Sequence, residues 1–181
     1  LNNAVATSER LLLFSDATQF NVNGGDLFTP RSVAIEQVSQ FANYAHLRPA
    51  AHGNSVFIAF QRGGFSGFYD YGLRSDTGLF DAFDVSEHCP TYIQGRTLRF
   101  EVSDTESFLF AKQDSYDGLF CFRFYTREGE RLQSAWFKVD VGAPVTDFWV
   151  VRDKLYLLVS RTPGLALEVM SLAEGAADPG L

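Results

Sequence analysis

The sequence has few cysteines, no long hydrophobic run and no basic cluster, and each shortage argues against a class of protein. Its 181 residues include two cysteines, Cys89 and Cys121, which lie far apart and outside any CxxC spacing. We therefore expect two reduced thiols rather than a disulfide framework or a zinc site. The longest apolar runs, such as 155–159, fall far short of the roughly 20 residues of a membrane-spanning helix. No membrane insertion by this segment is expected, and its first residues lack the features of a signal peptide.

Basic residues are also scarce relative to acidic ones. The chain has 15 Lys and Arg against 22 Asp and Glu, which gives a formal charge of -7. A protein that holds nucleic acid through its phosphates carries a basic patch, and none of the basic residues cluster here. Because an acidic surface repels phosphates, specific binding of DNA is not expected.

Aromatic and other β-favouring residues are abundant. The chain has 18 Phe, and 46% of its residues are hydrophobic while 20% are charged, which is typical of a folded globular chain. Phe, Tyr and Val favour half-buried pleated surfaces. The composition therefore predicts an all-β fold. The first residue is Leu rather than Met, which indicates a piece cut from a longer protein.

An apolar strand-loop-strand unit returns four times along the chain. The units centre on Leu12, Phe57, Phe108 and Tyr156, so successive units are 45, 51 and 48 residues apart. A period of about 40–50 residues built from short strands is typical of β-propeller blades. We therefore predict a partial β-propeller over residues 1–172, with three to four antiparallel blades near 10–38, 55–93, 97–139 and 146–172. Residues 173–181 are rich in Ala, Gly and Pro, which indicates a flexible tail or linker.

Local patterns within the units support strands. Residues 97–102 alternate polar and apolar, and Phe120, Phe122 and Phe124 project from one face of a strand. Residues 152–153 predict a tight hairpin turn, and Gly-containing turns separate the other runs. Residues 29–38 have a helix-like start at Thr29-Pro30, but the alternation that follows favours a strand. The expected core includes side chains from the last two units: Leu109, Phe120, Phe122, Phe124, Trp136, Tyr156 and Leu158.

The search for reactive groups finds no catalytic, cofactor-binding or metal-binding residues. His46 and His52 are six residues apart, a spacing that fits no metal pair, and His88 and Cys89 would point to opposite faces of a strand. The acidic cluster of Asp81, Asp84 and Glu87 is interleaved with apolar residues, as on a solvated strand edge.

The two remaining candidates have simple structural interpretations. Residues 63–67 lack the GK[ST] of a phosphate loop and are interpreted as a hairpin loop. Trp136 and Trp149 lie in alternating strands, so packing between blades is favoured over a binding role.

A set of segments, in order from Arg10 to Leu172, resembles one known family. The segments are 10–20, 27–33, 48–49, 53–57, 62–67, 84–93, 132–136, 155–157 and 167–170. The family they resemble is tail tubular protein B, the nozzle proteins of short-tailed, T7-like bacteriophages. The family tends to have a valine-like residue where this chain has Cys89. Family members are several times longer, so the chain looks like an internal fragment.

The resemblance implies a structural virion protein and not an enzyme. It implies a subunit of a hexameric tail nozzle, made in the bacterial host cytoplasm, through which the genome is ejected. The implied partners are other copies of itself in a ring and the adjacent tail tube and fibre proteins, while DNA passes without specific binding. No cofactor is implied.

Two alternatives stay open. The first is a carbohydrate- or protein-binding propeller, favoured if Trp136 and Trp149 were exposed beside Asp81 and Asp84. The second is a propeller glycosidase, which needs two carboxylates facing each other across roughly 5–9 Å.

Overall fold

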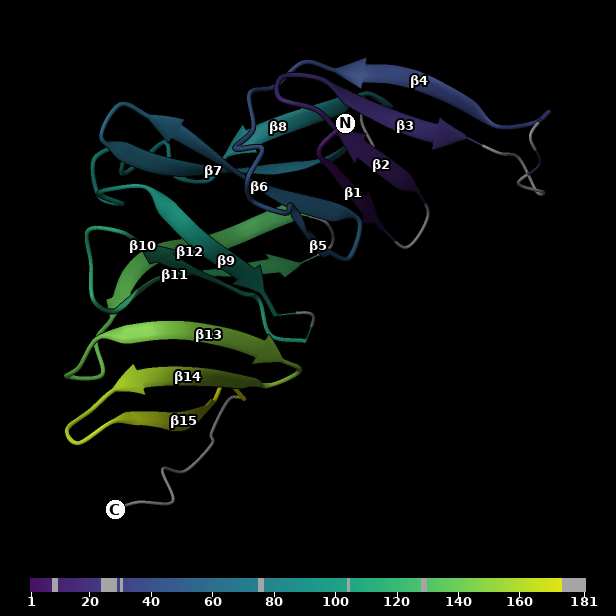
Figure 1. The fold of residues 1–181 in the computed structure, drawn as a ribbon. Coiled ribbons are helices and arrows are strands. Elements are labelled where there is room, and N and C mark those ends of the chain that lie inside the picture. The colour runs from purple at the N-terminus through teal and green to yellow at the C-terminus, as the bar shows by residue number, and fades with distance from the viewer. Residues whose placement is uncertain are drawn as a thin grey trace. The chain divides into compact units, whose positions relative to one another are not determined.

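The computed structural model describes residues 1–7, 10–23, 29, 31–74, 77–103, 105–127 and 130–173. All regular secondary structure in these ranges is β (Figure 1), which confirms the all-β prediction. Within the same ranges no helix is present that could cross a membrane. The chain divides into two compact units, 1–96 and 97–181. The predicted tail falls largely on 174–181, outside the described residues.

The first unit contains two four-stranded antiparallel sheets, which we call the first and second sheets. Each is a meander in chain order. The first sheet consists of β1 (Asn3–Ala6), β2 (Leu11–Phe14), β3 (Gln19–Asn23) and β4 (Ala34–Ser39). The second sheet consists of β5 (Ala50–His52), β6 (Ser55–Arg62), β7 (Phe65–Leu73) and β8 (Phe80–Asp84).

The second unit contains the third and fourth sheets, which are also antiparallel. The third sheet consists of β9 (Thr97–Val102), β10 (Phe108–Gln113), β11 (Leu119–Arg127) and β12 (Glu130–Val139). The fourth sheet consists of β13 (Val145–Val151), β14 (Lys154–Ser160) and β15 (Leu165–Ser171). The division of the chain into four separate antiparallel sheets is consistent with the predicted blade-like units. Their arrangement around a common axis stays a prediction.

Each predicted strand-loop-strand repeat is a hairpin at the same place in its sheet. The hairpins β2–β3, β6–β7, β10–β11 and β14–β15 are the second and third strands of their sheets. The repeat therefore predicts a fourth strand beside β15, and the described residues contain none there. The fourth sheet thus has one strand fewer than the other three.

The tight turns fall where the sequence predicts them. Arg62 pairs with Phe65, so Gly63 and Gly64 alone join β6 to β7, with Gly63 at a φ of 59°. Val151 pairs with Lys154, which leaves a two-residue turn at 152–153. A glycine tolerates the left-handed region without the steric cost that a side chain adds.

The second half of the ambiguous stretch 29–38 is a strand, as the alternation predicted, because β4 is Ala34–Ser39. The backbone NH of Ser32 donates to the carbonyl of Thr29 at 3.0 Å, which closes a turn before β4 begins at Ala34. The turn signals at 24–25 and 128–129 lie outside the described residues.

In the first unit, one face of the first sheet packs on the second sheet. Val5, Leu12 and Phe14 contribute to a buried cluster with Val56, Ile58 and Tyr71. The Phe14 and Tyr71 rings meet edge to face with centroids 6.0 Å apart, an arrangement that aromatic quadrupoles favour.

In the second unit, the third sheet is apolar on both faces. From one face, Phe108, Phe110, Leu119 and Cys121 pack against the fourth sheet in a buried cluster. The opposite face carries Leu109, Phe120, Phe122 and Phe124, all buried as predicted. Trp136 is half-buried, and its ring lies 4.9 Å from that of Phe122.

The predicted core positions on β14 are wrong. Leu155, Leu157 and Val159 point into the core, while Tyr156 and Leu158 are only half-buried on the other face. The physical reason is that 155–159 is apolar at every position, so the sequence contains no alternation that distinguishes the two faces.

Candidate assembly surface

The groups considered for chemistry do not form a reaction centre. Asp84 accepts hydrogen bonds from Arg62 at 2.7 Å and from the NH of Ser86 at 2.8 Å. Asp81 pairs with Gly72 and Asp84 with Tyr69, so these carboxylates lie three residues apart on β8 and point to opposite faces. This geometry does not favour the glycosidase alternative, which requires facing carboxylates.

The histidines and cysteines are likewise separate. His46 lies against Tyr44 with ring centroids 5.8 Å apart, His52 is on β5 and His88 is exposed. Cys89 and Cys121 are both free thiols, as predicted. Burial, with the nearby charge of Asp84, raises the pKa of Cys89. No group of three or more potential metal ligands occurs in the part of the chain that the structure describes.

Both tryptophans belong to the second unit. Trp136 packs on Phe122 with the ring planes tilted by 30°, and Trp149 is 37% exposed. The guanidinium of Arg99 lies 5.6 Å from the Trp149 ring centroid. The glycines at 63–64 form a hairpin turn followed by a strand, not a phosphate loop before a helix.

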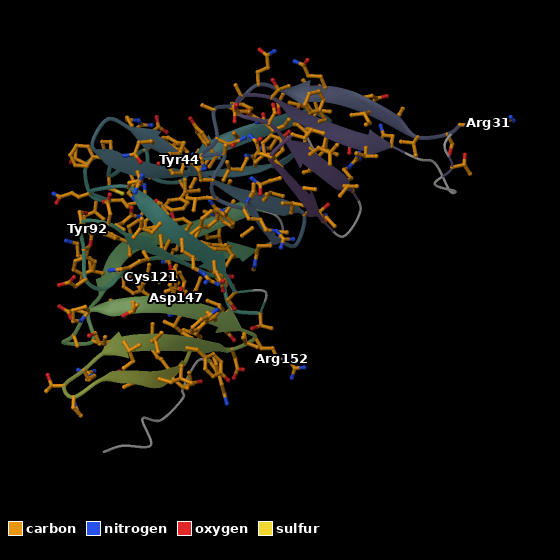
Figure 2. All side chains as sticks on the ribbon, viewed as in Figure 1. Arg31, Tyr44, Tyr92, Cys121, Asp147 and Arg152 are labelled. Carbon is orange, nitrogen blue, oxygen red and sulfur yellow. The ribbon has the colours of Figure 1, made fainter. Side chains whose placement is uncertain are left out.

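A polar junction joins the third and fourth sheets at β9 and β13. Arg99 donates from Nη1 to Asp147 at 3.1 Å and from Nε to Glu101 at 3.2 Å. The other oxygen of Glu101 accepts the backbone NH of Val150 at 2.9 Å. Burial alone would lower the pKa of Arg99, but the bonds and charges of the two carboxylates raise it overall. The guanidinium therefore stays charged and links the third sheet to the fourth (Asp147 is labelled in Figure 2).

A second contact fixes the β13–β14 turn. The hydroxyl of Ser103, which is fully buried, donates to the carbonyl of Arg152 at 2.9 Å. Arg152 itself is at a φ of 56° (Figure 2). The turn is thus anchored to the end of the neighbouring sheet.

The first and second sheets share a comparable polar junction. Gln19, with no exposed surface, donates to the carbonyl of Phe41 at 2.8 Å and accepts from the Ser39 hydroxyl at 2.9 Å. The Ser39 oxygen lies 2.7 Å from the hydroxyl of Tyr71. Because Ser39 directs its hydrogen to Gln19, Tyr71 is the donor in that pair. Burial raises the pKa of Tyr71 to about 12.

This junction predicts an alkaline dependence of stability. Tyr71 has an ordinary pKa of 10.0 and a folded pKa of about 12. The unfolded chain therefore loses this proton first, and stability that is fully present below pH 10 falls as the pH rises towards 12. The Tyr71→Phe variant should lose about 1 kcal/mol at neutral pH and then show a shallower decline across that window. Urea titrations at several pH values measure the loss at neutral pH and the decline of stability with pH. If stability declined equally in the two proteins between pH 10 and 12, Tyr71 would not be the group responsible.

In the part of the chain that the structure describes, the second face of the fourth sheet is largely exposed. We call it the open face. Its apolar side chains are Trp149, Val151, Tyr156, Leu158, Leu165, Leu167 and Val169, and Asp147 and Lys154 lie on the same face, opposite Leu158 and Val151. Leu165 and Leu167 are each 63% exposed, and Val151 and Val169 each 53%. A shallow hollow of about 480 Å³ is lined by five of these side chains: Trp149, Val151, Tyr156, Leu158 and Leu167.

Sequence reasoning missed the open face, although the signal was present. Antiparallel sheets with one wetted face alternate apolar and polar residues. β14 is apolar at five successive positions, and β15 places Leu165, Leu167 and Val169 on one face. A strand that is apolar on both faces indicates a sheet covered on both sides. The open face is therefore the strongest candidate for an assembly surface.

These features are typical of a structural β-sheet protein whose sheets pack on one another. The described residues contain no reaction centre. Comparison with known proteins specifies the family. The model of the bacteriophage nozzle protein family matches residues 1–180, and the chain belongs to that family. It is 29% identical over 147 residues to the tail tubular protein gp12 of Escherichia phage T7.

The match to the T7 protein is partial in length. It covers 80% of this chain but 18% of the T7 protein. The chain therefore corresponds to less than a fifth of that relative.

Proposed function

We propose that this chain is a structural segment of a phage tail nozzle, located in the virion tail, and that it catalyses no reaction. The observation that carries the proposal is the family match across 1–180, which coincides with a fold made of stackable sheets. Hydrophobic contacts and the two polar junctions would give a rigid wall.

In this proposal the four sheets are consecutive blades of a partial propeller spanning 1–172. Copies of the parent protein form a ring, which contacts the adjacent tail tube and fibre proteins, and the genome leaves through it. The net charge of -7 supports passage of the DNA without binding. A negatively charged protein surface repels the phosphates of DNA.

Genetics of the phage that encodes the chain tests this function. Removing the codons for 1–172 should leave particles that fill with DNA but do not infect, and supplying the intact gene in trans should restore infection. Counting plaques and measuring packaged DNA separate assembly of the head from function of the tail. Full infectivity without these codons would contradict the proposal.

A further inference from the structure

The last strand of the fourth sheet, β15, forms a long and regular edge (Figure 1). It pairs with β14 from Leu165 to Ser171 without a shift of register. On its other side, which we call the β15 edge, the part of the chain that the structure describes contains no strand. A strand edge presents backbone NH and carbonyl groups that can pair with a further strand.

Hydrogen bonds at the two ends of the β14–β15 ladder show which groups point to this edge. The NH of Arg161 donates to the carbonyl of Gly164 at 2.8 Å, and the NH of Leu172 donates to the carbonyl of Asp153 at 2.7 Å. Bonded and non-bonded pairs alternate along an antiparallel ladder. The NH groups that face β14, which we call the ladder amides, are those of Ala166, Glu168 and Met170. The NH groups that point to the β15 edge, which we call the edge amides, are those of Leu165, Leu167, Val169 and Ser171.

The other outer strands that the structure describes carry features that discourage pairing. β1 and β5 have four and three residues, and β8 has five with carboxylates at Asp81 and Asp84. The pairings of β4, β9, β12 and β13 each contain a shift of register, as at a β-bulge. Short length, charge and bulges are the usual protections of a sheet edge. β15 has seven residues, no bulge, no Pro and no Lys, and its one charged side chain, Glu168, is bonded to Arg161 at 2.7 Å.

The apolar side chains of β15 are also uncovered on this side. Leu165 and Leu167 are 63% exposed and Val169 is 53% exposed. Their neighbours on β14, Tyr156 and Leu158, have a strand on each side and are half-buried. A strand beside β15 would flank its side chains in the same way, because residues on one face of neighbouring strands pack together.

We propose that an extended segment of the parent nozzle protein pairs with the β15 edge as the fourth strand of this sheet, antiparallel to β15. The internal repeat identifies the occupant. In each of the other three sheets, the hairpin at the second and third positions is followed by a fourth strand antiparallel to the third. Backbone hydrogen bonds hold an added strand, and its alternate side chains give specificity. The segment is therefore about seven residues long, rich in β-branched or aromatic residues and free of Pro.

The source of this strand is a part of the parent protein outside these 181 residues. Residues 173–181 contain no β-branched or aromatic residue, and these are the types that favour strands. The match to the T7 protein covers 18% of that relative, so a nozzle protein of that length has ample chain to supply the strand. The inference rests on the proposed function only in that the chain is part of a longer nozzle protein.

Hydrogen exchange at single amides, measured on the purified parent protein and on the 181-residue chain, tests the proposal. In the parent, the edge amides are bonded to the added strand. They should exchange at least about a hundredfold more slowly there than in the 181-residue chain, where they meet water. The ladder amides should be protected in both proteins, which makes them the internal control.

Leu167→Pro tests the backbone pairing in the parent. It removes one edge amide and no bond to β14, and a strand edge tolerates proline. The remaining edge amides should lose their protection, while the ladder amides keep theirs. Leu167→Ala is the matched control, because it shortens the same side chain but keeps the NH, so its edge amides should stay protected. The comparison of the two unaltered proteins needs no variant, so it decides the question even if the proline variant does not fold.

Three results would overturn the proposal. Edge amides that exchange quickly in the parent would show that no strand covers them. Edge amides already protected in the 181-residue chain would assign the strand to residues 174–181 or, where dilution removes the protection, to a second copy. Protection in the parent that falls on dilution would assign the strand to another molecule. All three would leave the nozzle assignment untouched, because phage infectivity tests that assignment separately.

Discussion

Replacing Phe122 with alanine is expected to lower the free energy of unfolding by about 3–5 kcal/mol. Phe122 has no exposed surface and lies in the middle of the third sheet. Its ring contacts those of Phe124 and Trp136, at centroid distances of 5.5 and 4.9 Å. Truncation removes apolar burial and leaves a cavity that a sheet with fixed register cannot close.

Phe137→Ala is the matched control for this change. Phe137 is on the neighbouring strand β12, pairs with Cys121 and is 38% exposed. Its loss should cost about 1 kcal/mol, because much of the ring is already in water. Chemical denaturation measures both variants. Equal losses in the two variants would contradict the deeper burial of Phe122.

Replacing Gly118 with alanine is expected to cost about 3 kcal/mol, the upper end of the usual range for overpacking. A Cβ at this position would lie 2.2 Å from the carbonyl oxygen of Val139 and 2.8 Å from Cε1 of Tyr116. Val139 is paired with Leu119 at the start of β11, so its carbonyl cannot move without disturbing the strand pairing. Backbone must therefore shift.

Gly164→Ala provides the same chemical change at an open position. No atom lies within 4 Å of a Cβ built at Gly164, which immediately precedes β15. Its effect should stay within about 0.5 kcal/mol. A thermal melt of Gly118→Ala that matches this control would contradict the close approach at Gly118.

The repeated hairpin was predictable because its signals are local. Apolar runs broken by Gly63-Gly64 or Arg152-Asp153 specify two strands and a turn, since strand direction reverses within a few residues. The spacing of these hairpins then gives the number of sheets. The same reasoning predicts the buried face of β11, because Phe120, Phe122 and Phe124 recur at every second position.

The faces of β14 and the junctions between sheets were not predictable for a different physical reason. Residues 155–159 are uniformly apolar, so only the placement of the neighbouring sheet decides which side is covered. Arg99 and Asp147 are 48 residues apart, and Ser39 and Tyr71 are 32 apart. Such pairs form only once separate sheets have stacked, and no local pattern encodes them.

The open face was present in the sequence as an excess of apolar residues in β14 and β15. A pattern of this kind predicts that something covers both faces of a sheet, but not what covers it. The acidic residues considered as a catalytic pair show the reverse. Asp81 and Asp84 are near each other in sequence, yet the strand geometry points their side chains to opposite faces.

Electron cryo-microscopy of the tail of the phage that encodes this chain tests the central claim most directly. The account predicts that the nozzle density contains residues 1–173 as four consecutive antiparallel sheets, with the β2–β3, β6–β7, β10–β11 and β14–β15 hairpins as the second and third strands of their sheets. Density that shows these residues as helices or as one continuous sheet, or a tail that lacks them, would contradict the account.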